Sequence, residues 1–284
     1  LRGVPNSFKQ SMRQEYDDCV AWLESYVEQY MALREHGTFD ILTEAEYRAK
    51  YSHISIIPTM NVQTIKKDED GIPVRAKSRI VVLGNLEETL WSKSDVHAPV
   101  IRKESDRLLT TMAVERGRIQ KQGDCKNAFC HPILPDDEIV IVRPPPGCPI
   151  SKPGEYWLLR KTLYGLRRSP KHWYETLVAA LIKVGLSPCK HDPCVFTGSL
   201  IEGEPPLYLG VYVDDFTYFS DSDDVEKAFE QSLSMELQVD FMGDVAWFLG
   251  KCYDWQRTED DRVTVSITQT AKIESMLEEF DLLD

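Results

Sequence analysis

The chain has 284 residues and a mass of 32.6 kDa, with 42% apolar and 28% charged residues, a balance that excludes a disordered or fibrous protein and leaves room for one large or two medium domains. No apolar run reaches the roughly 18 residues that a membrane-spanning helix needs, and the start carries no signal-peptide pattern, so we expect a domain cut from a longer polypeptide, with no membrane partner. The net charge of −13 is concentrated in residues 214–284, which carry 19 acidic and 5 basic residues, so it does not exclude nucleic-acid binding by the rest of the chain.

The first predicted elements are a long helix and a hairpin. From about residue 7 to residue 35, apolar side chains recur at three- and four-residue steps, which predicts an amphipathic helix. Its predicted apolar face consists of Met12, Tyr16, Val20, Leu23, Val27, Tyr30 and Met31. Residues 54–64 and 72–83 are apolar and β-branched around a polar turn at residues 66–71, which predicts a two-stranded hairpin. Its second strand carries a basic cluster of Arg75, Lys77 and Arg79.

Helices and short strands alternate in the remaining chain. Ser105 is the predicted N-cap of a helix that ends at Gly117, and a second helix begins at Ser169 with Pro170 at its first position. Further strands are predicted at residues 138–143, 156–161, 207–213 and 216–219, and further helices at residues 224–235 and 271–284. This order predicts an α+β fold, and the absence of repeats or linkers gives no clean domain cut. A second basic cluster lies within residues 152–171.

The seven cysteines indicate free thiols in a reducing compartment, because their number is odd and they are thinly spread. Residues 189–194 (CKHDPC) resemble a metal-binding segment in composition only. A zinc site wants four ligands in two pairs, and no second pair is present, so we expect no zinc here.

The clearest candidate for chemistry is a pair of adjacent carboxylates, Asp214 and Asp215, between two apolar and aromatic strands. Two like charges in such a setting repel each other, so a cation is expected to compensate them. The bland interpretation is that aspartates are ordinary turn residues. Asp124 in a separate segment offers a third carboxylate, and three oxygen ligands of this kind suit a pair of Mg²⁺ ions in phosphoryl transfer.

Several segments resemble, in the same order, the reverse transcriptases of copia-type LTR retrotransposons. The four residues 212–215 (YVDD) are similar to the YxDD box of these enzymes. The other matching segments are residues 75–84 (RAKSRIVVLG), 94–100 (SDVHAPV), 124–129 (DCKNAF), 138–147 (EIVIVRPPPG), 163–170 (LYGLRRSP) with Trp173, and 248–250 (FLG). The resemblance covers the chain from about residue 10 to its end.

This resemblance implies a right-hand polymerase fold, in which an antiparallel palm sheet backed by helices carries the catalytic residues. It implies an N-terminal helical segment at residues 1–53, β-hairpin fingers at residues 54–117, and a palm at residues 118–245 with a finger-like portion at residues 130–160. Residues 246–284 would form a primer-grip hairpin and the start of a partial thumb. The partners implied are an RNA or DNA primer–template, deoxynucleoside triphosphates, and the RNase H and integrase regions of a parent polyprotein in a cytoplasmic virus-like particle.

The resemblance also assigns roles to individual residues. Asp124, Asp214 and Asp215 would be catalytic and would bind two Mg²⁺ ions, with Mn²⁺ able to substitute. The incoming nucleotide would contact Arg79, with Lys77 or Lys67 in support, and Asn127, Ala128, Phe129, Tyr164 and Gly165. Phe129 would lie under the sugar and exclude a 2′-hydroxyl. The template and primer would contact Arg167, Arg168, Ser169, Pro170, Tyr212, Phe248, Leu249 and Gly250.

Three departures from the family pattern keep alternatives open. The family's lysine on the helix after the YxDD hairpin has no counterpart near residues 235–237, Gly123 replaces an apolar residue before Asp124, and the acidic C-terminal segment is unlike a surface that holds nucleic acid. The first alternative is a non-catalytic or domesticated nucleic-acid-binding remnant of the same fold. The second is another metal-dependent palm enzyme such as a nucleotide cyclase, which would not need the basic hairpin or residues 163–173.

Overall fold

The computed structural model describes residues 4–5, 7–67 and 72–282. It divides into two compact units, each built from two stretches of the chain. The first unit comprises residues 1–97 and 129–173, and the second comprises residues 98–128 and 174–284. Because the chain leaves each unit and returns to it, the sequence shows no single linker between domains. Among the described residues, no helix combines the length and the apolar character that crossing a bilayer requires.

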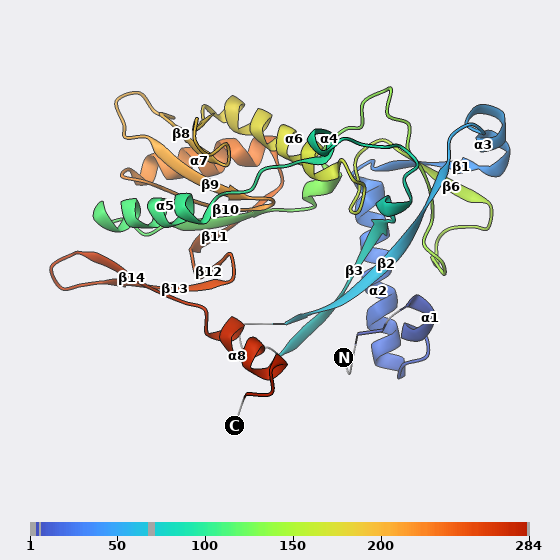
Figure 1. Ribbon diagram of the computed structural model, residues 1–284, viewed down its shortest axis with the longest axis horizontal. Coiled ribbons are helices and arrows are strands. Elements are labelled where there is room, and N and C mark those ends of the chain that lie inside the picture. The colour runs from blue at the N-terminus through green and yellow to red at the C-terminus, as the bar shows by residue number, and fades with distance from the viewer. Residues whose placement is uncertain (1–3, 6, 68–71, 283–284) are drawn as a thin grey trace. The chain divides into compact units, whose positions relative to one another are not determined.

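The first unit is built on a five-stranded sheet with the strand order β1-β6-β5-β2-β3. Strands β2 and β5 pair in parallel, and the other neighbours are antiparallel. Figure 1 shows β2 and β3 as a long twisted hairpin. The elements of this unit are α1 (Phe8–Ser11), α2 (Tyr16–Glu35), β1 (Phe39–Thr43), α3 (Glu44–Lys50), β2 (Ile56–Lys67), β3 (Pro73–Val82), η1 (Gly84–Leu86), α4 (Lys93–Val96), β5 (Ile141–Arg143) and β6 (Glu155–Leu159). The predicted hairpin is confirmed, and most of its predicted turn, residues 68–71, lies outside the described residues.

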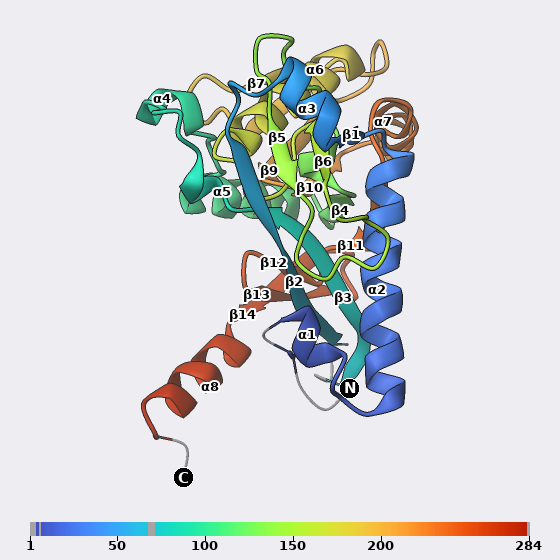
Figure 2. The same cartoon turned by 90° about the vertical axis from the view of Figure 1, so that its right-hand side faces the viewer.

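Helix α2 runs along β3 (Figure 2), where the hydroxyls of Ser25 and Ser78 are 2.8 Å apart. Its buried face consists of Trp22, Ser25, Tyr26, Tyr30 and Leu33. Of the predicted face, Tyr30 is buried, Val20, Leu23 and Val27 are only partly buried, and Met31 is half exposed, while the side chain of Tyr16 lies outside the description. Apolar side chains occur on more than one side of this helix, so their spacing alone does not show which side the sheet covers.

The predicted helix over residues 7–35 is in fact two helices, α1 and α2, because the backbone at Glu15 is extended. Two contacts hold the chain in this bend. The Trp22 indole donates a hydrogen bond to Gln14 Oε1 at 2.9 Å, and Gln63 Nε2 on β2 donates to Ser11 Oγ at 3.3 Å. Neither contact joins residues that are close in the sequence. The local spacing of apolar residues therefore does not reveal the break between α1 and α2.

The second unit contains a six-stranded antiparallel sheet with the order β11-β4-β10-β9-β8-β7 and a three-stranded sheet, β12-β13-β14. Helices α5 and α7 cover opposite faces of the larger sheet, because α5 packs on Phe219 of β10 and α7 packs on Phe216 and Tyr218. Its elements are α5 (Lys103–Glu115), β4 (Lys121–Cys125), β7 (Ser187–Pro188), β8 (Val195–Gly198), β9 (Leu207–Tyr212), β10 (Asp215–Ser220), α7 (Asp223–Glu236), β11 (Val239–Asp244), β12 (Trp247–Phe248), β13 (Lys251–Arg257), β14 (Val263–Thr268) and α8 (Thr270–Glu279). The short helix η2 (Ala128–Cys130) and helix α6 (Ser169–Val184) cross the boundaries between the units.

The N-terminus of α5 differs from its prediction and shows what residues 189–194 do. The helix begins at Lys103, with Arg102 rather than Ser105 at the N-cap. The backbone N–H groups of Arg102 and Cys194 both donate to the buried carboxylate of Asp192 at 3.0 Å. Burial works to raise the pKa of Asp192, but these hydrogen bonds and one from Ser105 outweigh it and lower the pKa. Asp192 therefore anchors the start of α5.

The predicted α+β class with an antiparallel sheet is confirmed, and so are the helices at α6 and α7 and the strands at β9 and β10. Strand β5 begins at Ile141 rather than at residue 138, and β6 spans Glu155–Leu159 rather than residues 156–161. Within the predicted C-terminal helix the structure has α8, whose side chains Ile273 and Met276, like that of the C-cap residue Phe280, are about half exposed or more.

Candidate active site

The candidate catalytic aspartates lie at the centre of the six-stranded sheet. Strands β9 and β10 form a tight hairpin that closes with the pair Tyr212 and Asp215, so that only Val213 and Asp214 make the turn. Val213 has a φ of 60°, which is a strained conformation for a β-branched residue. A turn of this kind holds Asp214 at the tip of the hairpin, directly beside Asp215.

Asp124 lies directly opposite Asp215 in the antiparallel pairing of β4 with β10. The backbone N–H of Cys125 also donates to the carbonyl oxygen of Asp214 at 2.9 Å. The fold therefore brings Asp124 together with the adjacent pair Asp214 and Asp215, which follows it by 90 residues, as the sequence interpretation expected. All three side chains are partly exposed.

The electrostatic environment of Asp215 combines burial with two neighbouring carboxylates. Burial, followed by the charges of Asp214 and Asp124, raises the pKa of Asp215 to about 6. Burial and the same aspartates also raise the pKa of the neighbouring Cys125 thiol. Carboxylate oxygens are the ligands that Mg²⁺ prefers, so the donor set suits such an ion. Within the described residues, however, no three His, Cys, Asp or Glu side chains are already gathered closely enough to hold a metal.

A fourth carboxylate, which no sequence motif singled out, is Asp240 in strand β11, opposite Asp124 on the other side of β4. Its Oδ1 atom is 2.6 Å from Nζ of Lys126 in an ion pair whose side chains are both about half exposed. The alternation of Leu237, Val239 and Phe241 with polar residues is the signal that could have predicted this strand.

The unusual Gly123 has a structural cause. Gly123 pairs across the sheet with Phe216 and Phe241, and a Cβ atom on Gly123 would lie 2.3 Å from Cζ of Phe216. The Phe216 ring therefore fills the space that an apolar residue before Asp124 would take. Close packing against this ring accounts for a glycine at position 123.

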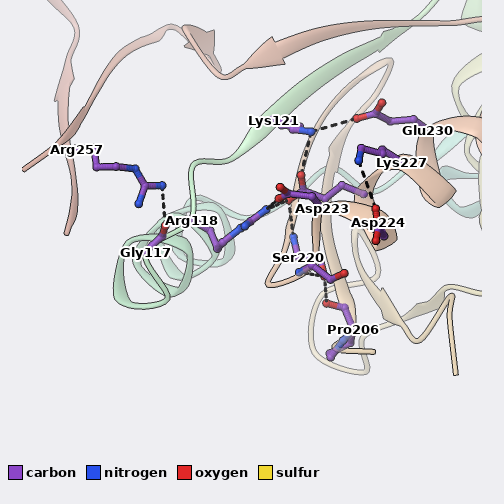
Figure 3. Close-up of polar contacts among 12 residues, drawn as sticks. Gly117, Arg118, Lys121, Pro206, Ser220, Asp223, Asp224, Lys227, Glu230 and Arg257 are labelled. Atoms are coloured by element: carbon purple, nitrogen blue, oxygen red, sulfur yellow. Dashed lines mark hydrogen bonds and ion pairs between the residues drawn. The ribbon is translucent and has the colours of Figure 1, made fainter. Parts of the chain in front are cut away.

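The end of this sheet far from the aspartates is fixed by a buried carboxylate, Glu226, in the first turn of α7. Its Oε1 accepts from the Ser220 N–H at 3.0 Å and from Arg118 at 3.1 Å, and its Oε2 lies 2.9 Å from Nζ of Lys121. Figure 3 shows that Arg118 also reaches Asp223 and that Lys121 also reaches Glu230. Burial works to lower the pKa of Lys121, but these carboxylates outweigh it and raise the pKa.

The predicted primer-grip residues form the turn of a second tight hairpin in the same unit. Phe248 on β12 pairs with Lys251 on β13, and both residues between them, Leu249 and Gly250, have positive φ angles of 52° and 71°. Phe248 is fully buried with Val245 and Tyr253, whereas Tyr212 of the other hairpin is partly exposed.

In the first unit, the fold gathers several predicted nucleotide-binding residues. Arg79 and Lys77 share one face of β3, and the Arg79 guanidinium lies 6.0 Å from the centre of the Tyr164 ring. Tyr164 in turn packs edge-to-face on Phe129, with ring centres 5.3 Å apart. The side chain of Lys67, the other candidate, lies outside the description, and Asn127 and Ala128 belong to the second unit.

Gly165 is required by close backbone approach. Its φ is 90°, and a Cβ atom there would lie 2.1 Å from the carbonyl oxygen of Val82. The N–H of Val82 donates to the carbonyl of Tyr164 at 2.7 Å, which fixes residues 164–165 against the end of β3. This contact explains how Arg79 and Tyr164 come together.

The residues after Gly165, which the sequence assigned to template and primer, are held by contacts within the first unit. Arg167 Nε donates to the carbonyl of Gly84 at 2.7 Å, although the residue is exposed. Arg168 forms an ion pair with Glu138 and lies 4.7 Å over the Trp91 ring, and its side chain is only 22% exposed. The Ser169 hydroxyl is buried and donates to the carbonyl of Leu163 at 2.7 Å, and Pro170 is partly exposed. Of these residues, Arg167 is the more accessible cation.

Comparisons with known proteins identify the class. The family described as "Reverse transcriptase (RNA-dependent DNA polymerase)" matches residues 49–284 of this chain. The chain therefore belongs to the reverse transcriptase family. Its relatives then narrow the assignment to the copia-type LTR-retrotransposon branch, as the sequence motifs predicted.

Two plant relatives support the assignment to the copia-type branch. The chain is 30% identical over 199 residues to "Retrovirus-related Pol polyprotein from transposon RE1" of Arabidopsis thaliana, over 70% of this chain and 13% of that protein. It is 27% identical over 219 residues to "Retrovirus-related Pol polyprotein from transposon TNT 1-94" of Nicotiana tabacum, over 77% of this chain and 16% of that protein. The chain thus spans less than a fifth of these relatives' length.

A solved structure of a foamy viral protease-reverse transcriptase in complex with double-stranded DNA is also similar to the chain. It aligns at a TM-score of 0.47 with 15% sequence identity, over 88% of this chain and 36% of that one.

Proposed function

We propose that this chain extends a nucleic-acid primer on an RNA or DNA template, with Asp124, Asp214 and Asp215 as its catalytic residues. The observation that carries this proposal is the cross-strand pair of Asp124 and Asp215 beside the Asp214 turn. The membership of the chain in the reverse transcriptase family supports the reaction class.

The proposed cofactors are two Mg²⁺ ions, or Mn²⁺ in their place, held by Asp124, Asp214 and Asp215. When bound, such ions stabilise charge on the transferred phosphoryl group and lower the pKa of the attacking hydroxyl. The three carboxylates supply hard oxygen ligands, and their mutual repulsion is relieved by a cation. Burial first, and then the charges of Asp214 and Asp124, raise the pKa of Asp215, and this supports the assignment.

For the deoxynucleoside triphosphate, we assign Arg79 and Lys77 to the phosphates, because both side chains share one face of β3. The backbone amides near Asn127 and Ala128 are further proposed contacts. Phe129, which packs on Tyr164 beside Gly165, would lie under the sugar and exclude a 2′-hydroxyl.

For the template and primer, we assign Arg167, Arg168, Ser169 and Pro170 of the first unit. From the second unit we assign Tyr212, Phe248, Leu249 and Gly250. The exposed Arg167 suits a phosphate contact, and the Leu249–Gly250 turn suits pressure on the primer end. The names fingers, palm and partial thumb for residues 54–117, 118–245 and 246–284 belong to the same proposal.

The parent context is proposed from the family as well. The chain would act within a polyprotein that includes RNase H and integrase regions, in a cytoplasmic virus-like particle. The plant relatives' names, which describe Pol polyproteins, support this context.

The test is extension of a DNA primer on an RNA template with Mg²⁺ or Mn²⁺. We expect extension by the wild-type chain and none by the Asp214→Asn/Asp215→Asn variant, which also controls for a contaminating polymerase. Binding of the duplex without extension, repeated in a form lengthened at the C-terminus, would instead support the non-catalytic alternative.

A further inference from the structure

One buried ion pair connects the predicted primer-grip hairpin with the scaffold of the aspartate sheet. Nζ of Lys251, on β13, lies 2.5 Å from Oδ2 of Asp106, on α5. The side chains are 14% and 2% exposed, so the pair is largely removed from water. A buried charge that loses its partner is strongly destabilising, so this pair fixes the distance between two elements that are 145 residues apart in the chain.

On the hairpin side, the pair acts next to the turn. Lys251 is the first residue of β13 and directly follows Gly250. Its backbone pairs with Phe248, so Lys251 and Phe248 close the Leu249–Gly250 turn. A displacement of the Lys251 side chain therefore also moves Leu249 and Gly250.

On the other side, α5 is packed closely on the aspartate hairpin. The N–H of Ile101 donates to the carbonyl of Val211, which is three residues before Asp214. A Cβ atom on Gly210 would lie 2.7 Å from Cδ1 of Ile101 and 2.8 Å from Cδ1 of Leu109, so no side chain separates β9 from this segment. The position of Asp106 is thus tied to the position of the catalytic turn.

The turn has two other neighbours on this side: Leu249 packs against the cluster that includes Ile101 and Leu109, and Tyr253 of β13 has a pKa that burial and then the charge of Asp106 raise. A groove of about 490 Å³ lies between α5 and β14, with Thr110 and Val114 on one wall and Val265 and Ile267 on the other. Two further hydrogen bonds lie away from the Leu249–Gly250 turn. The N–H of Val245 donates to the carbonyl of Gln120, and Arg257 donates to the carbonyl of Gly117 (Figure 3).

We propose that Asp106 and Lys251 are positioning residues that hold the Leu249–Gly250 turn at a fixed place relative to Asp214 and Asp215. This inference rests on the proposed polymerase function, because the turn would then place the primer 3′ end at the aspartates. An apolar pair would fill the same space, but it lacks the directional bond that selects one position of the hairpin.

The first experiment is hydrogen–deuterium exchange of residues 245–257, which needs no catalytic activity. In Lys251→Met and in the milder Asp106→Asn, we expect amides near the turn to exchange about tenfold faster than in the wild type. The matched control is Arg262→Met, which removes the exposed Arg262–Asp260 pair in the connection between β13 and β14 and should leave exchange at residues 245–252 unchanged. Unchanged exchange in both pair variants would overturn the proposal.

The second experiment is primer extension by the same variants. We expect kcat to fall about tenfold while duplex Kd stays within about twofold, because the primer end is misplaced but still bound. The double variant Asp106→Leu/Lys251→Met should recover thermal stability but not kcat. Full recovery of exchange protection and kcat in this double variant would show that the pair only fills space, and would overturn the proposal.

A wild-type chain that fails to extend any primer would overturn the proposed function. The exchange experiment would then decide separately whether the pair holds the turn. The two failures are therefore distinguishable.

Discussion

Phe216 lies across the sheet from Gly123, and its ring occupies the place where a side chain on residue 123 would stand, with Cζ 2.3 Å from the position of a Cβ. The aromatic ring packs further on Phe229 and Phe241. Because Asp124 follows Gly123 directly, this packing also sets the backbone that carries a catalytic candidate.

Gly123→Ala should therefore lower the free energy of unfolding by about 1–3 kcal/mol, the usual cost of overpacking a core. Urea denaturation measures this change. Gly123→Ala/Phe216→Leu should recover part of the loss, because the smaller side chain makes room. Gly203→Ala, at an open position with a φ of 83°, is the control for backbone strain alone. If Gly123→Ala and Gly123→Ala/Phe216→Leu lost the same free energy of unfolding, this explanation would be contradicted.

Asp215→Asn should stabilise the metal-free chain at alkaline pH. The native pKa of Asp215 is about 6, above the ordinary value near 4 of an unfolded aspartate, so ionisation of Asp215 disfavours the native state. Wild-type stability should fall as the pH rises from about 4 to about 6 and stay lower above this range. Asp215→Asn lacks this fall in the free energy of unfolding. Because solvent screens the partly exposed carboxylate, the fall in the wild type is on the order of 1 kcal/mol.

The measurement is urea denaturation at pH 5 and pH 8 with a chelator, and the exposed Asp137→Asn is the control. Addition of Mg²⁺ at pH 8 should stabilise the wild type more than Asp215→Asn. An Asp215→Asn variant that is less stable than wild type at pH 8 without metal would contradict the electrostatic account.

Glu226→Gln should destabilise the second unit by about 3–5 kcal/mol, because Arg118 and Lys121 lose their buried counter-charge. The matched control is Lys227→Ala on the same helix, which breaks the exposed Lys227–Asp224 pair (Figure 3). That exposed pair should contribute at most about 0.5 kcal/mol. Thermal denaturation of both variants makes the comparison, and similar losses in the two would show that burial of Glu226 is energetically unimportant.

Phe129→Ala should relax the selection of deoxynucleotides over ribonucleotides, on the order of tenfold or more in the ratio of kcat/KM values. The ring packs on Tyr164, so its removal leaves space at the proposed sugar position. Single-nucleotide insertion with dNTP and NTP pairs gives this ratio, and Tyr164→Phe, which keeps the ring contact, is the control. An unchanged ratio would place the sugar selection elsewhere.

The sequence by itself determined many of the local elements and the protein family. Apolar and aromatic runs on both sides of Asp214 and Asp215 predicted the strands β9 and β10, and Ser169 with Pro170 marked the start of α6. The ordered motifs from residue 75 to residue 250 predicted the reverse transcriptase family, because motif residues are read directly from the chain. These features depend on neighbours within a few residues, so local spacing is sufficient to reveal them.

Only the tertiary structure decided which distant residues meet. The register that places Asp124 opposite Asp215, the ring that makes residue 123 a glycine, and the buried partners of Glu226 and Lys251 all join separate segments. The same is true of α2, whose buried face depends on which side β3 covers. Strand register and side-chain burial are properties of the packed whole, so no local pattern in this chain specifies them.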